Sequence, residues 1–243
     1  FFDIGELAGV RVEDPEVFDE THAKALELVA DGLADGLRID HPDGLANPRE
    51  YLERLRDRGV ERIWVEKILE PGEELRGDWP VQGTTGYEFA NDATALFVDP
   101  AGEEPLTELY AELTGERRTF AQVAHEAKLE VATTTFAQEF ERLRELHPHD
   151  ALEAAAAALH VYRTYVEPAT GRVDEEDRRA VEALPDDLRA VLLLEGERTS
   201  ARDEFVVRWQ QTTGPVMAKG VEDTAFYRYN RFVALNEVGG DAG

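Results

Sequence analysis

The chain of 243 residues contains no cysteine, so it can form no disulfide bond and offers no thiolate nucleophile and no cysteine-based metal site. No apolar run approaches the roughly 18 residues that a membrane-spanning helix needs, and no signal peptide is visible. Lysine is scarce too: the four present are Lys24, Lys67, Lys128 and Lys219, and all other basic residues are arginines. These absences argue against a disulfide scaffold, a thiol-dependent enzyme and a membrane-spanning protein.

The chain has few basic residues: 52 acidic residues outnumber 26 basic ones, and the net charge is −26. Such a field repels the phosphates of nucleic acids and anionic lipids, so we expect neither a nucleic-acid nor a membrane partner. An acidic, lysine-poor surface suits a cytoplasm of high salt concentration, where screening weakens self-repulsion. A genome rich in G and C would also favour arginine over lysine. Both explanations stay open, and we expect a cytoplasmic protein.

The two ends of the chain do not resemble natural termini. The chain begins with Phe1-Phe2-Asp3-Ile4, without methionine, and residues 236–243 read as an interrupted loop. We therefore expect an internal piece of a longer enzyme. With 42% hydrophobic residues, the piece can still bury a substantial core.

The N-terminal part alternates between helix and strand. Helices are predicted to begin at Asp14-Pro15 and at Asn47-Pro48, where an N-cap residue precedes a proline. Short apolar runs predict strands over 36–40 and 62–68. Helix, strand, helix and strand joined by short turns are typical of a parallel sheet.

The remainder of the chain is predicted to be mostly helical. Thr119 and Gln122 form a capping box before a long amphipathic stretch that ends near 147–148, and Asp150 is expected to cap an alanine-rich helix. Two segments are predicted to be strands: 161–166, from its β-branched and aromatic residues, and 216–221, which would deliver Glu222 and Asp223. Further helices are expected over 174–184, 186–197 and 200–211.

The predicted fold class is α/β. About four strands are visible, and at most five, whereas a closed barrel needs eight and usually about 250 residues. We therefore expect a partial (β/α)8 TIM barrel, formed by its later strands, with a helix-rich insertion. The expected divisions are barrel units over 1–104, a helix-rich subdomain over 105–213, and a late barrel strand with its following helix over 214–243.

Two carboxylates end the first two predicted strands. Alternation places Arg38 on the same face as Asp40, and a guanidinium there favours the ionised carboxylate, as a nucleophile requires. Trp64 shares a face with Glu66 and could keep that residue protonated, as a general acid requires. Two such carboxylates, close together at strand ends, can cleave a glycosidic bond. The alternative is a structural Arg38–Asp40 ion pair and a solvated Glu66.

Several strings resemble a known family. Residues 35–41 (Asp-Gly-Leu-Arg-Ile-Asp-His) and 65–69 (Val-Glu-Lys-Ile-Leu) resemble the fourth- and fifth-strand motifs of the alpha-amylase superfamily of glycoside hydrolases. Longer strings over 41–46, 79–89 and 210–229 resemble, more narrowly, the maltooligosyltrehalose synthase family. The resemblance spans nearly the whole chain, although the helical middle is only loosely diagnostic.

This resemblance implies roles for individual residues. It implies that Asp40 is the nucleophile, Glu66 the general acid/base and Asp223 a third carboxylate that orients sugar hydroxyls. Arg38 would steady Asp40, and His41 would donate a hydrogen bond to the sugar. The alternative for Asp223 is a simple loop or helix cap before residues 224–227.

The resemblance also implies an intramolecular reaction. A glycosyl-enzyme forms on the nucleophile, and the released glucose then attacks it through its own 1-hydroxyl, giving an α,α-1,1 bond. Gln82, Tyr87 and Lys219 are candidates for holding that glucose, although 82–87 could be an ordinary glycine-bounded turn. The substrate would be a maltooligosaccharide, with no metal or organic cofactor. A trehalose-releasing hydrolase would act next in sequence. The alternatives are an α-glucan hydrolase and a catalytically incomplete binding fragment.

Overall fold

The computed structural model describes residues 9–243. The N-terminal residues 1–4, which do not resemble a natural terminus, therefore lie outside the described residues. Its sheet has three parallel strands in the order β1 (Leu37–Ile39), β2 (Ile63–Val65) and β3 (Gly83–Thr84). Leu37 pairs with Ile63, and Trp64 pairs with Gly83. The prediction of a parallel sheet is confirmed. The strand β3 was not predicted, because its glycines and threonines read as a turn.

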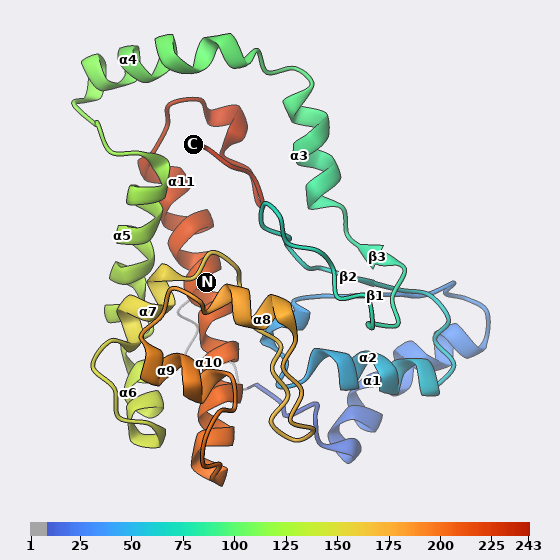
Figure 1. Cartoon of the computed structure of the whole chain (residues 1–243). Helices are drawn as coiled ribbons and strands as arrows, with labels where there is room; N and C mark the ends of the chain where they lie inside the picture. The colour runs from blue at the N-terminus through green and yellow to red at the C-terminus, as the bar shows by residue number, and fades with distance from the viewer. Residues whose placement is uncertain (1–8) are drawn as a thin grey trace.

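Two helices cover one face of the sheet, α1 (Pro15–Ala30) and α2 (Pro48–Asp57) (Figure 1). Both begin as predicted: the side chain of Asp14 accepts a hydrogen bond from the amide of Glu16 at 2.9 Å, and that of Asn47 from the amide of Glu50 at 3.2 Å. Between the helices and the sheet lies an apolar core with these fully buried members: Phe18, Leu52, Leu55, Val60, Ile63 and Val65.

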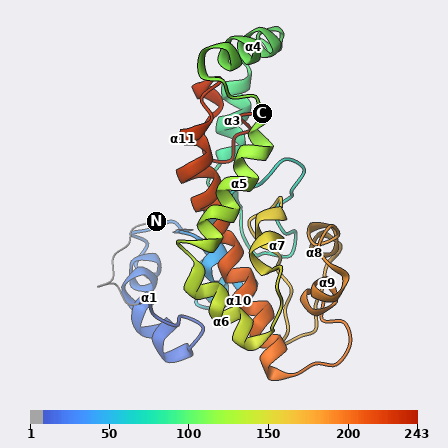
Figure 2. The ribbon, with the colours of Figure 1, turned by 90° about the vertical axis from the view of Figure 1, so that its left-hand side faces the viewer.

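Most of the remaining helices form a second body around a long helix, α10 (Ser200–Met217) (Figure 2). Around it lie α5 (Phe120–Thr133), α6 (Ala137–Leu146), α7 (Leu152–Ala158), α8 (Glu175–Ala180) and α9 (Asp186–Leu192). Their core includes fully buried Phe140, Leu188 and Trp209. The capping box of Thr119 and Gln122 is confirmed. The predicted helix breaks between α5 and α6, however, and α7 begins after Ala151 without a side-chain cap from Asp150.

The predicted strand over 161–166 is wrong. The segment contains no strand residue and pairs with no strand among the described residues. Instead, the side chain of Gln210 accepts a hydrogen bond from the amide of Val166 at 2.7 Å and donates one to its carbonyl at 3.0 Å. A buried glutamine thus satisfies both backbone groups of Val166 without a neighbouring strand. The bulky side chains that predicted a strand are buried against helices instead.

The predicted strand over 216–221 is also wrong, because α10 continues to Met217 and a π-helix follows at Ala218–Ala225. A short apolar run cannot by itself distinguish a buried strand from a buried helix. In the structure this segment packs closely against α5: a Cβ on Gly220 would lie 2.7 Å from Cα of Lys128. Only glycine permits this approach. A short helix, α11 (Phe226–Arg228), completes the segment.

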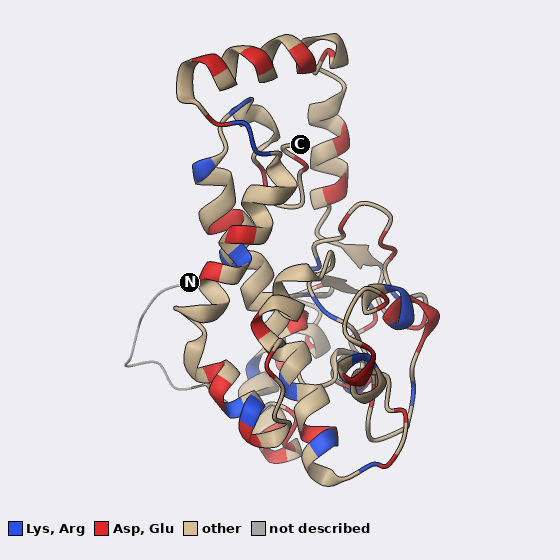
Figure 3. Cartoon of the chain, turned by 60° about the vertical axis from the view of Figure 1, so that its left-hand side comes forward, with Lys and Arg blue, Asp and Glu red and all other residues tan. Residues whose placement is uncertain are grey.

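An arm extends from the sheet. It consists of α3 (Tyr87–Ala95) and α4 (Glu103–Thr114), which carry acidic but no basic side chains (Figure 3). Neither helix has a buried residue, and Phe97 between them is 90% exposed. Short 3-10 turns at Pro42–Gly44, Pro100–Gly102 and Val233–Leu235 join other elements.

The predicted divisions at 104/105 and 213/214 both fall inside helices, α4 and α10, and they stay a prediction. No helix within residues 9–243 is long and apolar enough to cross a lipid bilayer.

Candidate active site

The register of β1 and β2 brings two carboxylates side by side. Ile39 pairs with Val65, so Asp40 and Glu66 both follow directly at the carboxyl ends of adjacent strands. The amide of Glu66 donates a hydrogen bond to the carbonyl of Ile39 at 2.8 Å, which extends the ladder to the candidate site. Strand ends of this kind are where parallel barrels carry their active sites.

A single guanidinium joins the two carboxylates. Arg38 donates from Nη1 to Oδ1 of Asp40 at 2.7 Å, and its Nη2 lies 3.1 Å from Oε1 of Glu66. The hydrogen bond from Arg38 holds the pKa of Asp40 below its usual value, and a hydrogen bond with Glu66 acts in the same direction. The arrangement therefore places an ionised carboxylate beside a second carboxyl group on the same guanidinium.

Two further donors hold the Glu66 carboxyl group. Its Oε2 accepts a hydrogen bond from the backbone amide of His41 at 3.2 Å, and its Oε1 accepts one from the hydroxyl of Tyr87 at 3.2 Å. Burial raises the pKa of Tyr87, and the negative charge of Glu66 raises it further. Tyr87 therefore stays a neutral donor. It begins α3 directly after β3, so the third strand delivers it to the site.

His41 has a left-handed backbone, with φ of 42°. The reversal turns the chain sharply after β1 and directs the His41 amide at Glu66. Gly44 leaves room for the imidazole ring, because a Cβ there would lie 2.6 Å from Cδ2 of His41. A larger residue at position 44 would collide with the His41 ring, which explains the glycine in the segment that follows Asp40.

The third predicted carboxylate, Asp223, lies in the π-helix and not at a strand end. It pairs with Lys219 one turn earlier, with 3.2 Å between Nζ and Oδ2. Burial raises the pKa of the adjacent Glu222, and the charges of Asp223 and Glu66 act in the same direction. Glu222 thus lies near both of these carboxyl groups, so the π-helix approaches the strand ends.

The structure does not place Gln82 beside the candidate carboxylates. Its Oε1 accepts a hydrogen bond from the amide of Ile63 at 2.5 Å, and its Nε2 donates to the carbonyl of Glu61 at 3.2 Å. Both partners lie at the amino end of β2, opposite the carboxylates. The side chain of Gln82 therefore extends the hydrogen bonding of the sheet at the amino end of β2. Trp64, which was expected to shield Glu66, is 38% exposed.

A buried polar cluster behind the site was missed by sequence reasoning. It consists of Asp43, Lys67, Glu73, Tyr162 and Glu222. One signal was available: Lys67 directly follows Glu66, and alternation along a strand turns its side chain to the opposite, buried face. The partner Tyr162 is 95 positions away in the chain, and no local pattern could reveal it.

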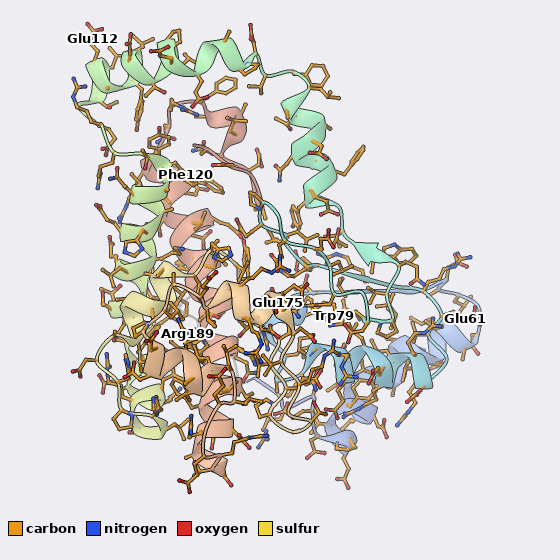
Figure 4. The ribbon with its side chains drawn as sticks, in the orientation of Figure 1. Glu61, Trp79, Glu112, Phe120, Glu175 and Arg189 are labelled. Carbon is orange, nitrogen blue, oxygen red and sulfur yellow. The ribbon has the colours of Figure 1, made fainter. Side chains whose placement is uncertain are left out.

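A cavity of about 850 Å³ lies away from the carboxylates, between α2, the 163–174 loop and α10. Trp79, labelled in Figure 4, lines it. Its ring packs edge-on against Tyr165, with ring centroids 5.1 Å apart. The charged residues of the cavity wall pair with one another: both bonds between the Arg49 guanidinium and the Glu167 carboxylate measure 2.6 Å. Asp40, Glu66 and Asp223 do not line this cavity.

Comparisons with known proteins agree on one family. No protein-family model matches the chain. A curated Mycobacterium tuberculosis protein, provisionally named maltooligosyl trehalose synthase, is 38% identical over 252 residues; the match covers 99% of this chain and 33% of that protein. The maltooligosyltrehalose synthase structure from Arthrobacter ramosus is 44% identical with a TM-score of 0.83, covering 99% of this chain and 33% of that one.

A third relative, a Sulfolobus tokodaii structure described as a hypothetical maltooligosyl trehalose synthase, is 34% identical with a TM-score of 0.85 and covers 99% of this chain and 32% of that one. The predicted resemblance to maltooligosyltrehalose synthases is therefore confirmed along nearly all of this chain. The chain spans about a third of the length of these relatives.

Proposed function

We propose that the complete protein that carries these residues is a maltooligosyltrehalose synthase. It would convert the reducing-end α-1,4 bond of a maltooligosaccharide into an α,α-1,1 bond by intramolecular transglycosylation. The observation that carries this proposal is the pair of carboxyl groups, Asp40 and Glu66, at adjacent strand ends and on one guanidinium. A retaining glycosidase needs such a pair about 5–5.5 Å apart.

Asp40 would be the nucleophile. It attacks the anomeric carbon while Glu66 protonates the leaving oxygen, so a covalent glycosyl-enzyme forms and a free glucose is released. Arg38 supports this step, because its hydrogen bond lowers the pKa of Asp40 and keeps the attacking oxygen ionised. Glu66 then acts as a base and takes the proton of the glucose 1-hydroxyl. That oxygen attacks the anomeric carbon of the glycosyl-enzyme, so the bond to Asp40 breaks as the α,α-1,1 bond forms.

Other residues would hold the sugar. Asp223 would orient sugar hydroxyls, and His41 would donate a hydrogen bond to the ring at the cleavage point. Lys219 and Tyr87 would keep the released glucose in place while water is excluded. Support for Tyr87 comes from its hydrogen bond to Glu66, and support for Lys219 from its pairing with Asp223. Gln82 has the weakest support, because its side chain bonds the sheet edge.

The sheet would be part of a (β/α)8 TIM barrel, with residues 105–213 as a helix-rich insertion. Parallel sheets are normally covered on both faces. Here helices cover one face, whereas the other carries Arg38, 50% exposed along its side chain, and Trp64, 38% exposed. Further strands of the longer protein would close the barrel over this face. The isolated chain is therefore expected to show little activity.

The product would be the substrate of a trehalose-releasing hydrolase. The cytoplasmic location and the absence of a cofactor stay predictions.

The test is incubation of the complete protein with maltopentaose and a count of reducing ends. An isomerase makes reducing ends disappear, because both anomeric carbons enter the new bond. An α-glucan hydrolase would increase them, and that result would reject the proposal in favour of the alternative. Asp40→Asn should abolish the reaction, whereas Asp31→Asn, an exposed change at the end of α1, should not.

A further inference from the structure

Each of the three candidate carboxylates has a charged neighbour in the chain whose side chain belongs to the polar cluster of Asp43, Lys67, Glu73, Tyr162 and Glu222. Asp43 lies three positions after Asp40, Lys67 directly follows Glu66, and Glu222 directly precedes Asp223. Asp43 is 4% exposed and Lys67 is 2% exposed. Charged groups are rarely so deeply buried unless they are paired. Three separate segments thus send a polar side chain to the same side of the site.

These side chains meet behind the site. Nζ of Lys67 lies 3.0 Å from Oε1 of Glu73 and 3.7 Å from Oδ2 of Asp43. The same ammonium lies over the ring of Tyr162, 5.2 Å from its centroid. The hydroxyl of Tyr162 donates a hydrogen bond to Oε1 of Glu222. Tyr162 therefore contacts both the segment that follows Glu66 and the segment that carries Asp223.

The position of Tyr162 is itself firmly determined. The next residue, Arg163, is 2% exposed and donates hydrogen bonds to the carbonyl groups of Asp43 at 2.7 Å and Leu45 at 2.6 Å. Gln210 of α10 holds the far end of the segment at Val166. The segment 161–166 thus connects the helical body with the loop after β1. Through this connection the helical region helps to fix the loop that follows β1.

We propose that Tyr162 is a positioning residue: its hydroxyl holds the π-helix through Glu222, and its ring holds the end of β2 through Lys67, so that Asp223 and Glu66 keep their relative position. The inference rests on the proposed function, because it assigns Tyr162 a part in that reaction. Its side chain contacts Glu222 and Lys67, and no hydrogen bond or ring contact within residues 9–243 joins it to Asp40, Glu66 or Asp223. Loss of its hydroxyl should misplace a reacting group, which slows the chemical step more than it weakens substrate binding.

The test is Tyr162→Phe in the complete protein, with maltopentaose as substrate. This change keeps the ring over Lys67 and removes only the hydrogen bond to Glu222. We expect kcat to fall about tenfold while KM stays within twofold. Tyr110→Phe is the matched control, because it removes a tyrosine hydroxyl that donates to the Arg228 carbonyl at 3.3 Å in a different apolar cluster. Its kcat should stay within twofold of wild type.

Equal kcat values in Tyr162→Phe and wild type would overturn the inference. Glu222 offers a second test that does not depend on the folding of the tyrosine variant. Glu222→Gln keeps an acceptor oxygen for Tyr162 and should retain kcat within threefold, whereas Glu222→Ala should lose about tenfold. Equal kcat values in the two Glu222 variants would also overturn it. If the wild-type protein makes no non-reducing product, the proposed function itself has failed, which is a different result.

Discussion

Arg38 lies 2.7 Å from Asp40, Nη1 to Oδ1, although the two residues are only two positions apart in the chain. The alternation of a strand turns both side chains to the same face, and the guanidinium then also reaches Glu66 on the next strand. The guanidinium of Arg38 thus links the ends of the two strands. Its chemical consequence is a lowered pKa of Asp40, chiefly through the hydrogen bond from Arg38.

The first prediction concerns pH. Asp40 must be ionised to attack, and its lowered pKa keeps it ionised as the pH falls. Arg38→Met removes the main cause of that lowering, so the pKa of Asp40 should rise. The acid limb of the kcat/KM profile should therefore move to higher pH. Arg58→Met, which removes an arginine paired with Asp19 on the helix surface, should leave the profile in place. An unmoved acid limb in the Arg38 variant would contradict this account.

The second prediction concerns Tyr87, whose hydroxyl donates to Oε1 of Glu66 at 3.2 Å. Tyr87→Phe removes this donor and leaves the ring in place. A hydrogen bond to a charged group contributes about 1.5–3 kcal/mol, so kcat with maltopentaose should fall at least about tenfold. Tyr227→Phe alters a side chain that is 79% exposed and serves as the control. Similar rates in both variants would show that this contact has no influence on turnover.

The third prediction concerns the packing of the π-helix against α5. A Cβ on Gly220 would lie 2.6 Å from Cγ and 2.7 Å from Cα of Lys128. Gly220→Ala must therefore displace backbone, which should cost about 1–3 kcal/mol of stability and lower kcat. Gly77→Ala is the control, because a Cβ there meets nothing within 4 Å. Thermal unfolding of the two variants should separate them by several degrees, and equal midpoints would refute the close approach.

The fourth prediction concerns Arg163. Its Nη1 donates to the carbonyl groups of Asp43 and Leu45. Arg163→Met would leave these buried acceptors without a donor, at a cost of about 3 kcal/mol in the free energy of unfolding. Arg208→Met breaks only an exposed pair with Glu204 and should cost less than about 1 kcal/mol. Urea denaturation of the complete protein measures both. A loss of equal size in the two variants would count against a structural role for Arg163.

Local sequence signals correctly predicted those elements whose structure depends on interactions between residues close together in the chain. Asn47 caps α2 through its own side chain, and the prolines after Asp14 and Asn47 suit a first helical turn. The two strands with their carboxylates could be predicted for the same reason, since alternation acts within three to five residues. The roles of Asp40, Glu66 and Asp223 came from the resemblance, and they stay a proposal.

Long-range contacts decided the rest. Residues 161–166 have the composition of a strand, but the amide of Val166 bonds Gln210, 44 positions away, and the amide of Tyr165 bonds Asp177. Residues 216–221 lie in α10 and the π-helix, where Gly220 packs closely against Lys128 of α5. The sequence by itself determined which residues could carry the chemistry and which short elements would present them. Only the tertiary structure decided that Gln82 lies at the other end of the sheet, that Asp223 arrives on a helix, and that Tyr162 stands behind the site. Burial and hydrogen bonding between distant segments outweigh the weaker local preferences of the backbone.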